Sequence, residues 1–263
     1  TVEVKGPSSE TAFDEMQNMI ETDLSSGTYD GIVISPLQSD TAAQLVSGTK
    51  LPIVAIDTNF DAPEVVSYVG TGNEAAAKSG GLAAMKKAKS NGADKPQAVI
   101  LTGAQGDETH EARLRGYRSA VEQAGGTVLE VQYCDAQPDR AAAAMEAVMQ
   151  KYPQGVDALL VTSDDMALAA IKCIWDNNSA AYQKTVICGF DGNQAAVEAL
   201  DRGELTVDIA QQGYEMGYKA VEAALDALEG KSVESVIDSG SEVITADNID
   251  AYIADCREKG LWS

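Results

Sequence analysis

The sequence predicts an α/β fold in which parallel strands alternate with crossover helices. Short runs of β-branched and aliphatic residues recur along the chain, and nearly all are followed by a turn and a segment of helical period. Hydrophobic residues make up 44% of the 263 residues, which is enough for one large or two modest cores. This alternation is typical of parallel sheets with helices on both faces.

The strands are predicted from β-branched runs that end in turn residues. The runs GIVIS and PIVAI are continuously apolar, as in strands that are buried on both faces. The predicted strands are residues 1–4, 31–35, 52–56, 65–69, 98–102, 128–133, 158–162, 185–189 and 205–210.

The helices are predicted where apolar residues recur at three- and four-residue steps. The clearest is residues 215–228, in which Met216, Ala220 and Ala224 form one stripe and Glu222 lies opposite. Several helical segments end in a glycine suited to a left-handed cap, as at Gly27, Gly92 and Gly230. The other predicted helices are residues 11–24, 74–88, 111–124, 140–152, 166–177 and 194–202.

The charge and apolarity of the chain exclude two classes of partner. Acidic residues number 41 against 19 basic ones, for a formal net charge of -22, so the surface would repel nucleic acid and anionic lipid. No apolar run approaches the roughly 20 residues of a membrane helix, and the first residues lack the zones of a signal peptide. We therefore expect a soluble chain, mature or trimmed, without a nucleic-acid partner.

The cysteines and the single histidine predict no metal site and no cofactor. The four cysteines lie far apart without C-x-x-C spacing, and we interpret them as small buried side chains, with a disulfide between some pair left open. His110 is predicted to be a surface residue in the first turn of a helix. No G-x-S-x-G motif or phosphate loop is present, so enzyme activity is the least supported function.

The stretch VGTGNEAA, residues 69–76, matches the glycine pattern of dinucleotide-binding folds. In such a fold the strand after the glycine-rich helix ends in an acid that holds the ribose hydroxyls. Here that strand ends in Leu101-Thr102-Gly103, and the acid is missing. We interpret Gly70 and Gly72 instead as a bend where the chain leaves one sheet.

Polar residues cluster where several predicted strands end, and open parallel sheets bind ligands at that edge. Carboxylates, amides and a guanidinium together can both donate to and accept from neighbouring hydroxyls, which is what a polyol requires. Asp164, which precedes Met166-Ala167-Leu168, is interpreted as a helix cap. The candidate ligand residues are Asp57, Thr58, Arg113, Ser163, Asp191 and Gln211.

Six segments in this order and spacing resemble bacterial periplasmic sugar-binding proteins of the ribose-binding type. They are IVISPLQSD, LPIVAIDTN, EARLRGY, VTSDDMALAAI, VICGFDGN and LTVDIAQQGYEMGYKAVEAAL. The resemblance implies two doubly wound parallel-sheet lobes joined by a hinge of three crossovers. It places residues 1–71 and 212–240 in the first lobe, and residues 72–211 and 241–263 in the second.

The same resemblance assigns roles to the candidate residues. Asp57 and Asp191 would accept hydrogen bonds from sugar hydroxyls, Arg113 would donate from the far lobe, and Gln211 would lie at the hinge. Thr58 stands where ribose binders have an arginine, and Ser163 where they have an asparagine. The loop YCDAQPDR lacks the family's aromatic residue; Tyr133 and Phe60 are the candidates for a residue that stacks on the sugar ring.

The start of the chain departs from the family. It opens on what resembles the second strand, so that about one βα unit is absent, and we expect a truncated product or a fragment of a longer chain. The missing strand would leave a sheet edge open between the strands at residues 1 and 31. Strand addition by a second copy at that edge is a route to a homodimer.

The resemblance implies a non-catalytic receptor. It would bind a monosaccharide or related polyol in the cleft between the lobes and close by rotation at the hinge. It would deliver the sugar to the membrane permease of an ABC importer, in the periplasm or, as a lipoprotein, on the outer face of the membrane. The alternative is the effector-sensing core of a lactose-repressor-type transcription regulator.

Overall fold

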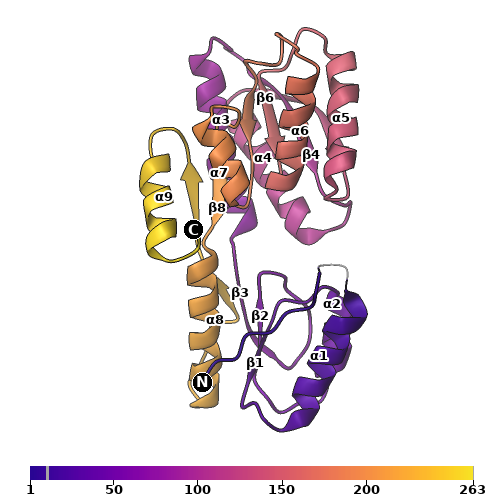
Figure 1. The fold of residues 1–263 in the computed structure, drawn as a ribbon, viewed down its shortest axis with the longest axis vertical. Helices are drawn as coiled ribbons and strands as arrows, with labels where there is room; N and C mark the ends of the chain where they lie inside the picture. The colour runs from indigo at the N-terminus through magenta and orange to yellow at the C-terminus, as the bar shows by residue number, and fades with distance from the viewer. Residues whose placement is uncertain (10–11, 263) are drawn as a thin grey trace. The chain divides into compact units, whose positions relative to one another are not determined.

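The computed structural model describes residues 1–9 and 12–262. The chain divides into two compact units, and it passes from one to the other three times (Figure 1). Unit 1 comprises Thr1–Thr71 and Gln212–Gly240, and unit 2 comprises Gly72–Gln211 and Ser241–Ser263.

Unit 1 is a parallel sheet with helices on both faces. Its strand order is β1-β2-β3-β9. The elements are α1 (Phe13–Ser26), β1 (Ile32–Ile34), α2 (Ser39–Val46), β2 (Ile53–Ile56), β3 (Val65–Gly70), α8 (Gly213–Leu228) and β9 (Val236–Asp238).

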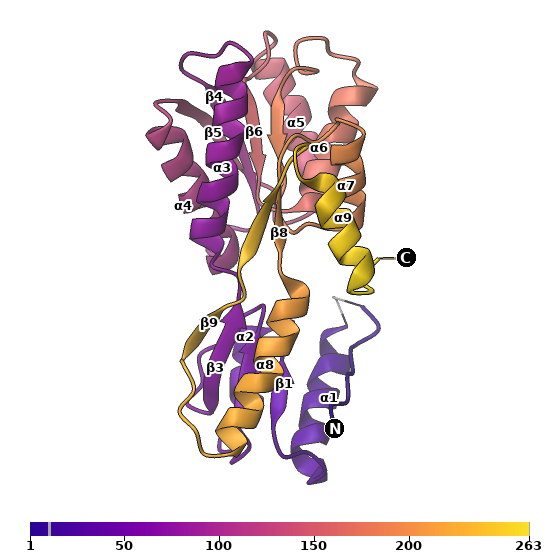
Figure 2. The ribbon, with the colours of Figure 1, turned by 90° about the vertical axis from the view of Figure 1, so that its left-hand side faces the viewer.

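Alternate residues of β2 show how unit 1 is packed. Ile53 and Ala55 point into a core shared with α1 and α2, whereas Val54 points into a core shared with α8. Successive side chains of a strand point to opposite faces of the sheet. A continuous apolar run therefore serves two helix layers at once, and Figure 2 shows α8 and α1 on opposite sides of β1.

Unit 2 contains a parallel sheet in the order β5-β4-β6-β7, followed by an antiparallel pair of β8 and β10. Two isolated parallel bridges, Cys188↔Val207 and Asp191↔Ala210, place the β8 segment beside β7. The elements are α3 (Asn73–Ser90), β4 (Gln97–Thr102), α4 (Glu108–Gln123), β5 (Thr127–Tyr133), α5 (Pro138–Lys151), β6 (Ala158–Val161), α6 (Asp164–Asp176), β7 (Val186–Cys188), α7 (Gln194–Asp201), β8 (Asp208–Gln211), β10 (Ser241–Ile244) and α9 (Ile249–Glu258).

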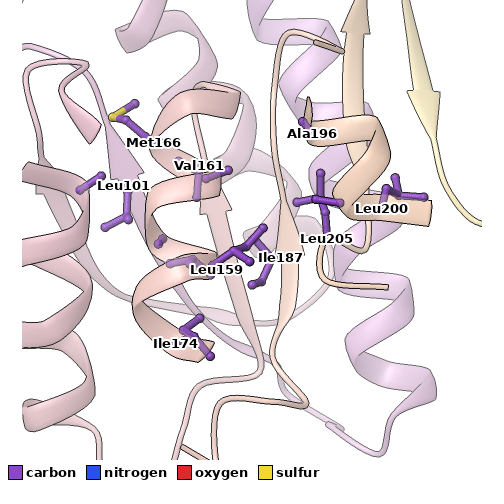
Figure 3. Close-up of a cluster of buried hydrophobic side chains, with 14 of the residues drawn as sticks. Leu101, Leu159, Val161, Met166, Ile174, Ile187, Ala196, Leu200 and Leu205 are labelled. Carbon is purple, nitrogen blue, oxygen red and sulfur yellow. The ribbon is translucent and has the colours of Figure 1, made fainter. Parts of the chain in front are cut away.

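The two faces of β4 carry the two cores of unit 2. Val99 and Leu101 join a core with α5, α6 and α7, part of which is drawn in Figure 3. Ala98 and Ile100 join a second core with α3 and α4 on the other face. The predicted α/β fold with parallel sheets is confirmed.

The structure corrects several predicted elements. Residues 1–4 form no strand; Val4 is 90% exposed, and the segment is fastened by side chains, as from Lys5 to Asp23 in α1. An alternating pattern forms a strand only beside another backbone, and these residues have none among the described ones. Thr11, where the first helix was predicted to begin, lies outside the described residues. The sequence analysis missed α2, α9, β9 and β10, which are short elements of 3 to 10 residues.

Two further predictions concern the state of the cysteines and the presence of a membrane-spanning helix. All four cysteines are free and buried, which agrees with their interpretation as small apolar side chains. Burial raises the pKa of the Cys134 thiol to about 11. In the part of the chain that the structure describes, no helix combines the length and the apolarity needed to cross a membrane.

Candidate functional site

Arg113 is the centre of a polar cluster in unit 2. It lies on α4, whose first turn is capped by the Asp107 carboxylate accepting from the His110 amide. Although arginine is seldom buried, this side chain is only about 6% exposed. A buried charge is costly unless hydrogen-bonding or oppositely charged groups compensate for the lost water. The guanidinium of Arg113 has such partners on several elements.

The partners of Arg113 come from separate elements. Its Nε donates to Asn73 Oδ1 at 2.8 Å, and its Nη1 donates to the Thr162 carbonyl at 2.8 Å and to Asp191 Oδ1 at 3.1 Å. Its guanidinium carbon lies 3.8 Å from the centre of the buried Phe190 ring. The side chain is therefore fixed by hydrogen bonds, an ion pair and a cation–π contact.

Asp191 is the acceptor on which the cluster converges. Gln211 Nε2 donates to Asp191 Oδ1 at 2.8 Å, so one carboxylate oxygen receives both an amide and a guanidinium. The Asp191 backbone donates to the Ile209 carbonyl and accepts from the Gln211 amide. Its φ of 129° is unusual for a residue with a side chain. These bonds to β8 hold that strained conformation in place.

The two glycines of the GFDG motif are needed for different structural reasons. Gly192 has φ +77°, and a Cβ there would lie 2.6 Å from the Cα of Ala210 in β8. A Cβ on Gly189 would lie 2.5 Å from Asp164 Oδ1. The motif therefore lets the loop pass β8 closely while a carboxyl group fills the space beside Gly189.

The glycine of the R-x-x-G motif sets the distance between α3 and α4. A Cβ on Gly116 would collide with the Glu74 carbonyl and approach the Ala77 Cβ to 2.8 Å. Because α4 can approach α3 closely, Arg113 on α4 reaches Asn73 at the start of α3. The spacing of the motif thus joins a helix contact to the position of a charged side chain.

His110 lies near Arg113 and Thr162. The prediction that it is a surface residue is wrong. The structure half-buries it, with Nδ1 2.9 Å from Thr162 Oγ1, and its ring occupies the space where a Cβ on Gly103 would lie. Burial, and secondly the charge of Arg113, lowers the pKa of His110. The helical period did not reveal this contact, because Thr162 is distant in the sequence.

The sequence matches a known protein family over most of its length. The sequence model of the periplasmic binding protein domain matches residues 1–232. The chain belongs to the periplasmic binding protein domain family. The predicted resemblance is therefore confirmed at the level of the family.

Named relatives of this periplasmic binding protein are sugar-import proteins. The ribose import binding protein RbsB of Bacillus subtilis is 30% identical over 218 residues, which cover 82% of this chain and 68% of the relative. Its counterpart in Salmonella typhimurium is 28% identical over 207 residues, covering 78% of this chain and 67% of the relative.

Solved structures give the same fold. A carbohydrate transporter solute-binding protein from Agrobacterium radiobacter, in complex with D-arabinose, has a TM-score of 0.75 and 25% identity, covering 94% of this chain and 84% of that one. A solute-binding protein from Actinobacillus succinogenes with bound D-allose has a TM-score of 0.79 at 21% identity, covering 94% and 87%. The second likeness concerns the fold alone.

The structure of this periplasmic binding protein brings three of the candidate residues together. Arg113, Asp191 and Gln211 are in mutual contact through Asp191 Oδ1. Ser163 follows Thr162 directly and is the N-cap residue of α6, with no hydrogen bond of its side chain to the helix.

The remaining two candidates, Asp57 and Thr58, lie in unit 1 directly after β2. The Asp57 amide donates to the Val69 carbonyl, its carbonyl accepts from the Tyr68 hydroxyl at 2.8 Å, and its side chain is exposed. The Tyr68 hydroxyl lies where a Cβ on Gly70 would be placed. The first glycine of VGTGNEAA therefore makes room for a tyrosine.

Sequence reasoning missed Asn73, Thr162 and Phe190 as parts of the cluster. Phe190 stands inside the quoted GFDG motif, and Asn73 follows the glycine pair of VGTGNEAA, so both positions carried a signal. Phe60, named as a candidate for ring stacking, is 5% exposed and belongs to the core of unit 1. Tyr133 is 41% exposed and donates to Glu111.

Proposed function

We propose that this chain is a non-catalytic receptor that binds a monosaccharide or related polyol and delivers it to the permease of an ABC importer. Its place would be the periplasm or the outer face of the membrane. The named relatives support this proposal because they are sugar-import proteins of the same family. The observation that carries it is the convergence of Arg113 and Gln211 on Asp191 Oδ1.

The charge balance of the cluster favours a neutral ligand. The guanidinium of Arg113 is already paired with the Asp191 carboxylate, so the pair carries no net charge to attract an anion. Guanidinium and amide groups donate, and a carboxylate accepts, so one hydroxyl-rich ligand can use both kinds of group. With a formal net charge of -22 on the chain, a nucleotide is a poorer candidate than a sugar.

The roles of single residues are part of the proposal. Asp191 is half-exposed, at 32% of its side chain, and would accept from a hydroxyl while Arg113 and Gln211 keep it oriented. Ser163 is proposed to donate or accept beside them. Asp57 and Thr58 are proposed as ligand residues of unit 1, with the Asp57 carboxylate as the acceptor.

A thermal-shift and calorimetric screen tests this function. The panel contains D-ribose, D-allose, D-arabinose, myo-inositol, glycerol and a nucleotide. A ligand at 100 times its dissociation constant should stabilise the protein by about 2.7 kcal/mol, which gives a clear rise of the unfolding midpoint. A response to one sugar that disappears in Asp191→Asn supports the receptor. A response to the nucleotide alone, or a sugar response unchanged in that variant, contradicts the proposal.

Two other expectations find no support in the comparisons. The relatives named above are transport proteins, and nothing favours the effector core of a repressor. Nothing supports the homodimer through an open sheet edge either, and we do not propose it.

A further inference from the structure

Two buried carboxyl groups lie next to the polar cluster of Arg113, Asp191 and Gln211. Asp164 and Asp208 are both 0% exposed, although the sequence predicted Asp164 as a helix cap. That prediction is wrong: Ser163 is the N-cap of α6, and Asp164 Oδ2 accepts instead from the Asn193 amide at 2.8 Å. Asp208 Oδ1 accepts from the Ile209 amide at 2.7 Å.

The other oxygen of each carboxyl group is unsatisfied. Among the described residues, neither Asp164 Oδ1 nor Asp208 Oδ2 has a hydrogen-bond partner. Two ionised carboxylates can only accept, so they cannot satisfy one another, and burying both charges is costly. One added proton changes this, because the protonated group becomes a donor and the other remains an acceptor.

The groups that face the pair do not neutralise it. The Asp191 carboxylate adds a like charge to both, and Tyr117, Cys188 and Tyr252 are neutral side chains nearby. The charge of Arg113 acts on Tyr117, but this guanidinium is already paired with the Asp191 carboxylate. Burial, then the neighbouring carboxylates, raises the pKa of Asp164, and burial raises the pKa of Asp208 to about 7.

The pair is joined to the parts that hold the candidate ligand residues. Asp164 follows Ser163, and through the Asn193 amide it holds the loop that contains Asp191. Asp208 begins β8, which ends at Gln211. A Cβ on Gly189 would lie 2.5 Å from Asp164 Oδ1 and 3.3 Å from Asp208 Oδ1, so both carboxyl groups border the space that the missing Cβ leaves. The two carboxyl groups therefore lie where three segments meet: the start of α6, the loop that contains Asp191, and the start of β8.

We propose that Asp164 and Asp208 share one proton and act as a positioning pair that holds the Asp191 loop against α6 and β8. Loss of the proton leaves two buried like charges beside a third, and the loop separates from the pair. The shared proton is a property of the protein alone. Its effect on ligand affinity rests on the proposed function.

The first test uses the ligand-free protein. The carboxyl groups are observed by ¹³C NMR, and the unfolding midpoint is measured across about pH 4 to 9, for the wild type, Asp208→Asn and Asp164→Asn. Because the native pKa lies above the unfolded one, the native state binds more protons, and wild-type stability should fall as pH rises from about 4 to about 7. In Asp208→Asn a permanent N–H replaces the proton, so this fall should shrink.

The matched control is Asp165→Asn, which removes an exposed carboxylate from the same first turn of α6. Its midpoint should follow the pH dependence of the wild type. The proposal is overturned if both buried carboxyl groups are ionised at about pH 5, below the native pKa, or if Asp208→Asn and Asp165→Asn behave alike. A midpoint that rises with added Ca²⁺ at constant ionic strength in the wild type but not in Asp208→Asn would also overturn it, because a cation would then hold the pair. The wild-type NMR titration decides the matter even if a variant fails to fold.

The second test measures the affinity for the sugar that the screen identifies. Affinity should fall by about threefold or more between about pH 6 and pH 9 in the wild type, and by less in Asp208→Asn. A titrating pair with a pH-independent affinity overturns the coupling to the site. If no sugar binds at any pH, the proposed function fails, whereas the NMR result still decides whether the proton is shared.

Discussion

Two aspartates, Asp191 in unit 2 and Asp57 in unit 1, show how one sequence pattern leads to two environments. Each follows a buried parallel strand, and each has a positive φ, of 129° and 62°. Asp191 is half-buried and accepts from Arg113 and Gln211. The Asp57 side chain is exposed, and its backbone rather than its carboxylate is held, by Tyr68 and Val69.

The difference shows what a position at the end of a strand does and does not specify. Such a position brings a carboxylate to the edge where ligands bind in parallel sheets. Its energetic role depends on the neighbours supplied by distant segments. Asp191 contributes to the stability of unit 2 as well as to the proposed site, whereas the exposed Asp57 carboxylate is expected to contribute little to the stability of unit 1.

The largest effect is expected from Arg113→Ala. Breaking a buried ion pair leaves the Asp191 carboxylate and the Thr162 carbonyl without their donor, and we expect a loss of about 3–5 kcal/mol in unfolding free energy. Sugar binding should be lost as well. Urea unfolding and calorimetry measure the two quantities.

The control for this variant is Arg115→Ala on the same helix. Arg115 is exposed and pairs with Glu74 and Glu108 at the surface. Its removal should change the unfolding free energy far less than the removal of Arg113, because exposed ion pairs contribute little to stability. Equal losses for the two arginines would show that burial does not distinguish them.

Asp191→Asn should weaken sugar affinity by roughly 2–5 kcal/mol, because the buried Arg113 guanidinium loses its charged partner. Stability should fall in parallel, since the same contact serves both. Titration calorimetry and chemical unfolding on one preparation give both values. An affinity within about threefold of the wild type would remove Asp191 from the site.

Asp57→Asn is expected to separate affinity from stability. Asparagine tolerates the left-handed backbone, and the side chain is exposed, so unfolding free energy should change by less than about 0.5 kcal/mol. If the carboxylate accepts from a ligand hydroxyl, affinity should fall by about 1.5–3 kcal/mol. A variant that binds as tightly as the wild type excludes Asp57 from the ligand contacts.

A pair of glycine substitutions compares helix packing in the two units. Gly116→Ala places a Cβ against the Glu74 carbonyl and should destabilise unit 2 by about 1–3 kcal/mol. Gly217→Ala in α8 meets nothing within 4 Å and should stabilise unit 1 by about 0.5–1 kcal/mol. Thermal unfolding monitors both, and a stabilising Gly116→Ala would contradict the close approach of α4 to α3.

The smallest effect concerns His110 and pH. Its pKa is lowered by burial, so below the unfolded value of 6.5 the unfolded chain binds more protons than the native one. His110 therefore stabilises the protein above that pH and ceases to do so as pH falls through its native pKa. The difference in midpoint between the wild type and His110→Gln should shrink toward acidic pH. A constant difference would show that His110 does not titrate with folding.

Local patterns were sufficient for much of the fold. Buried strands such as β2 and β6 are short continuous apolar runs, and α8 repeats small apolar residues at helical spacing, so period and composition revealed them. The strand predicted at residues 1–4 failed because its formation depends on a neighbouring backbone. The short β9 and β10 are specified by pairing with β3 and β8 rather than by their own residues.

The sequence by itself placed Arg113, Asp191 and Gln211 at strand and helix ends and, through its motifs, indicated the family. Only the tertiary structure decided that Arg113, Asp191 and Gln211 meet at one carboxylate oxygen, that His110 is half-buried, and that Asp164 lies with Asp208 beside Gly189 rather than capping its helix. The physical reason is that backbone periodicity depends on neighbours along the chain. Burial, charge pairing and the sharing of a proton depend on residues that only folding brings within hydrogen-bond distance.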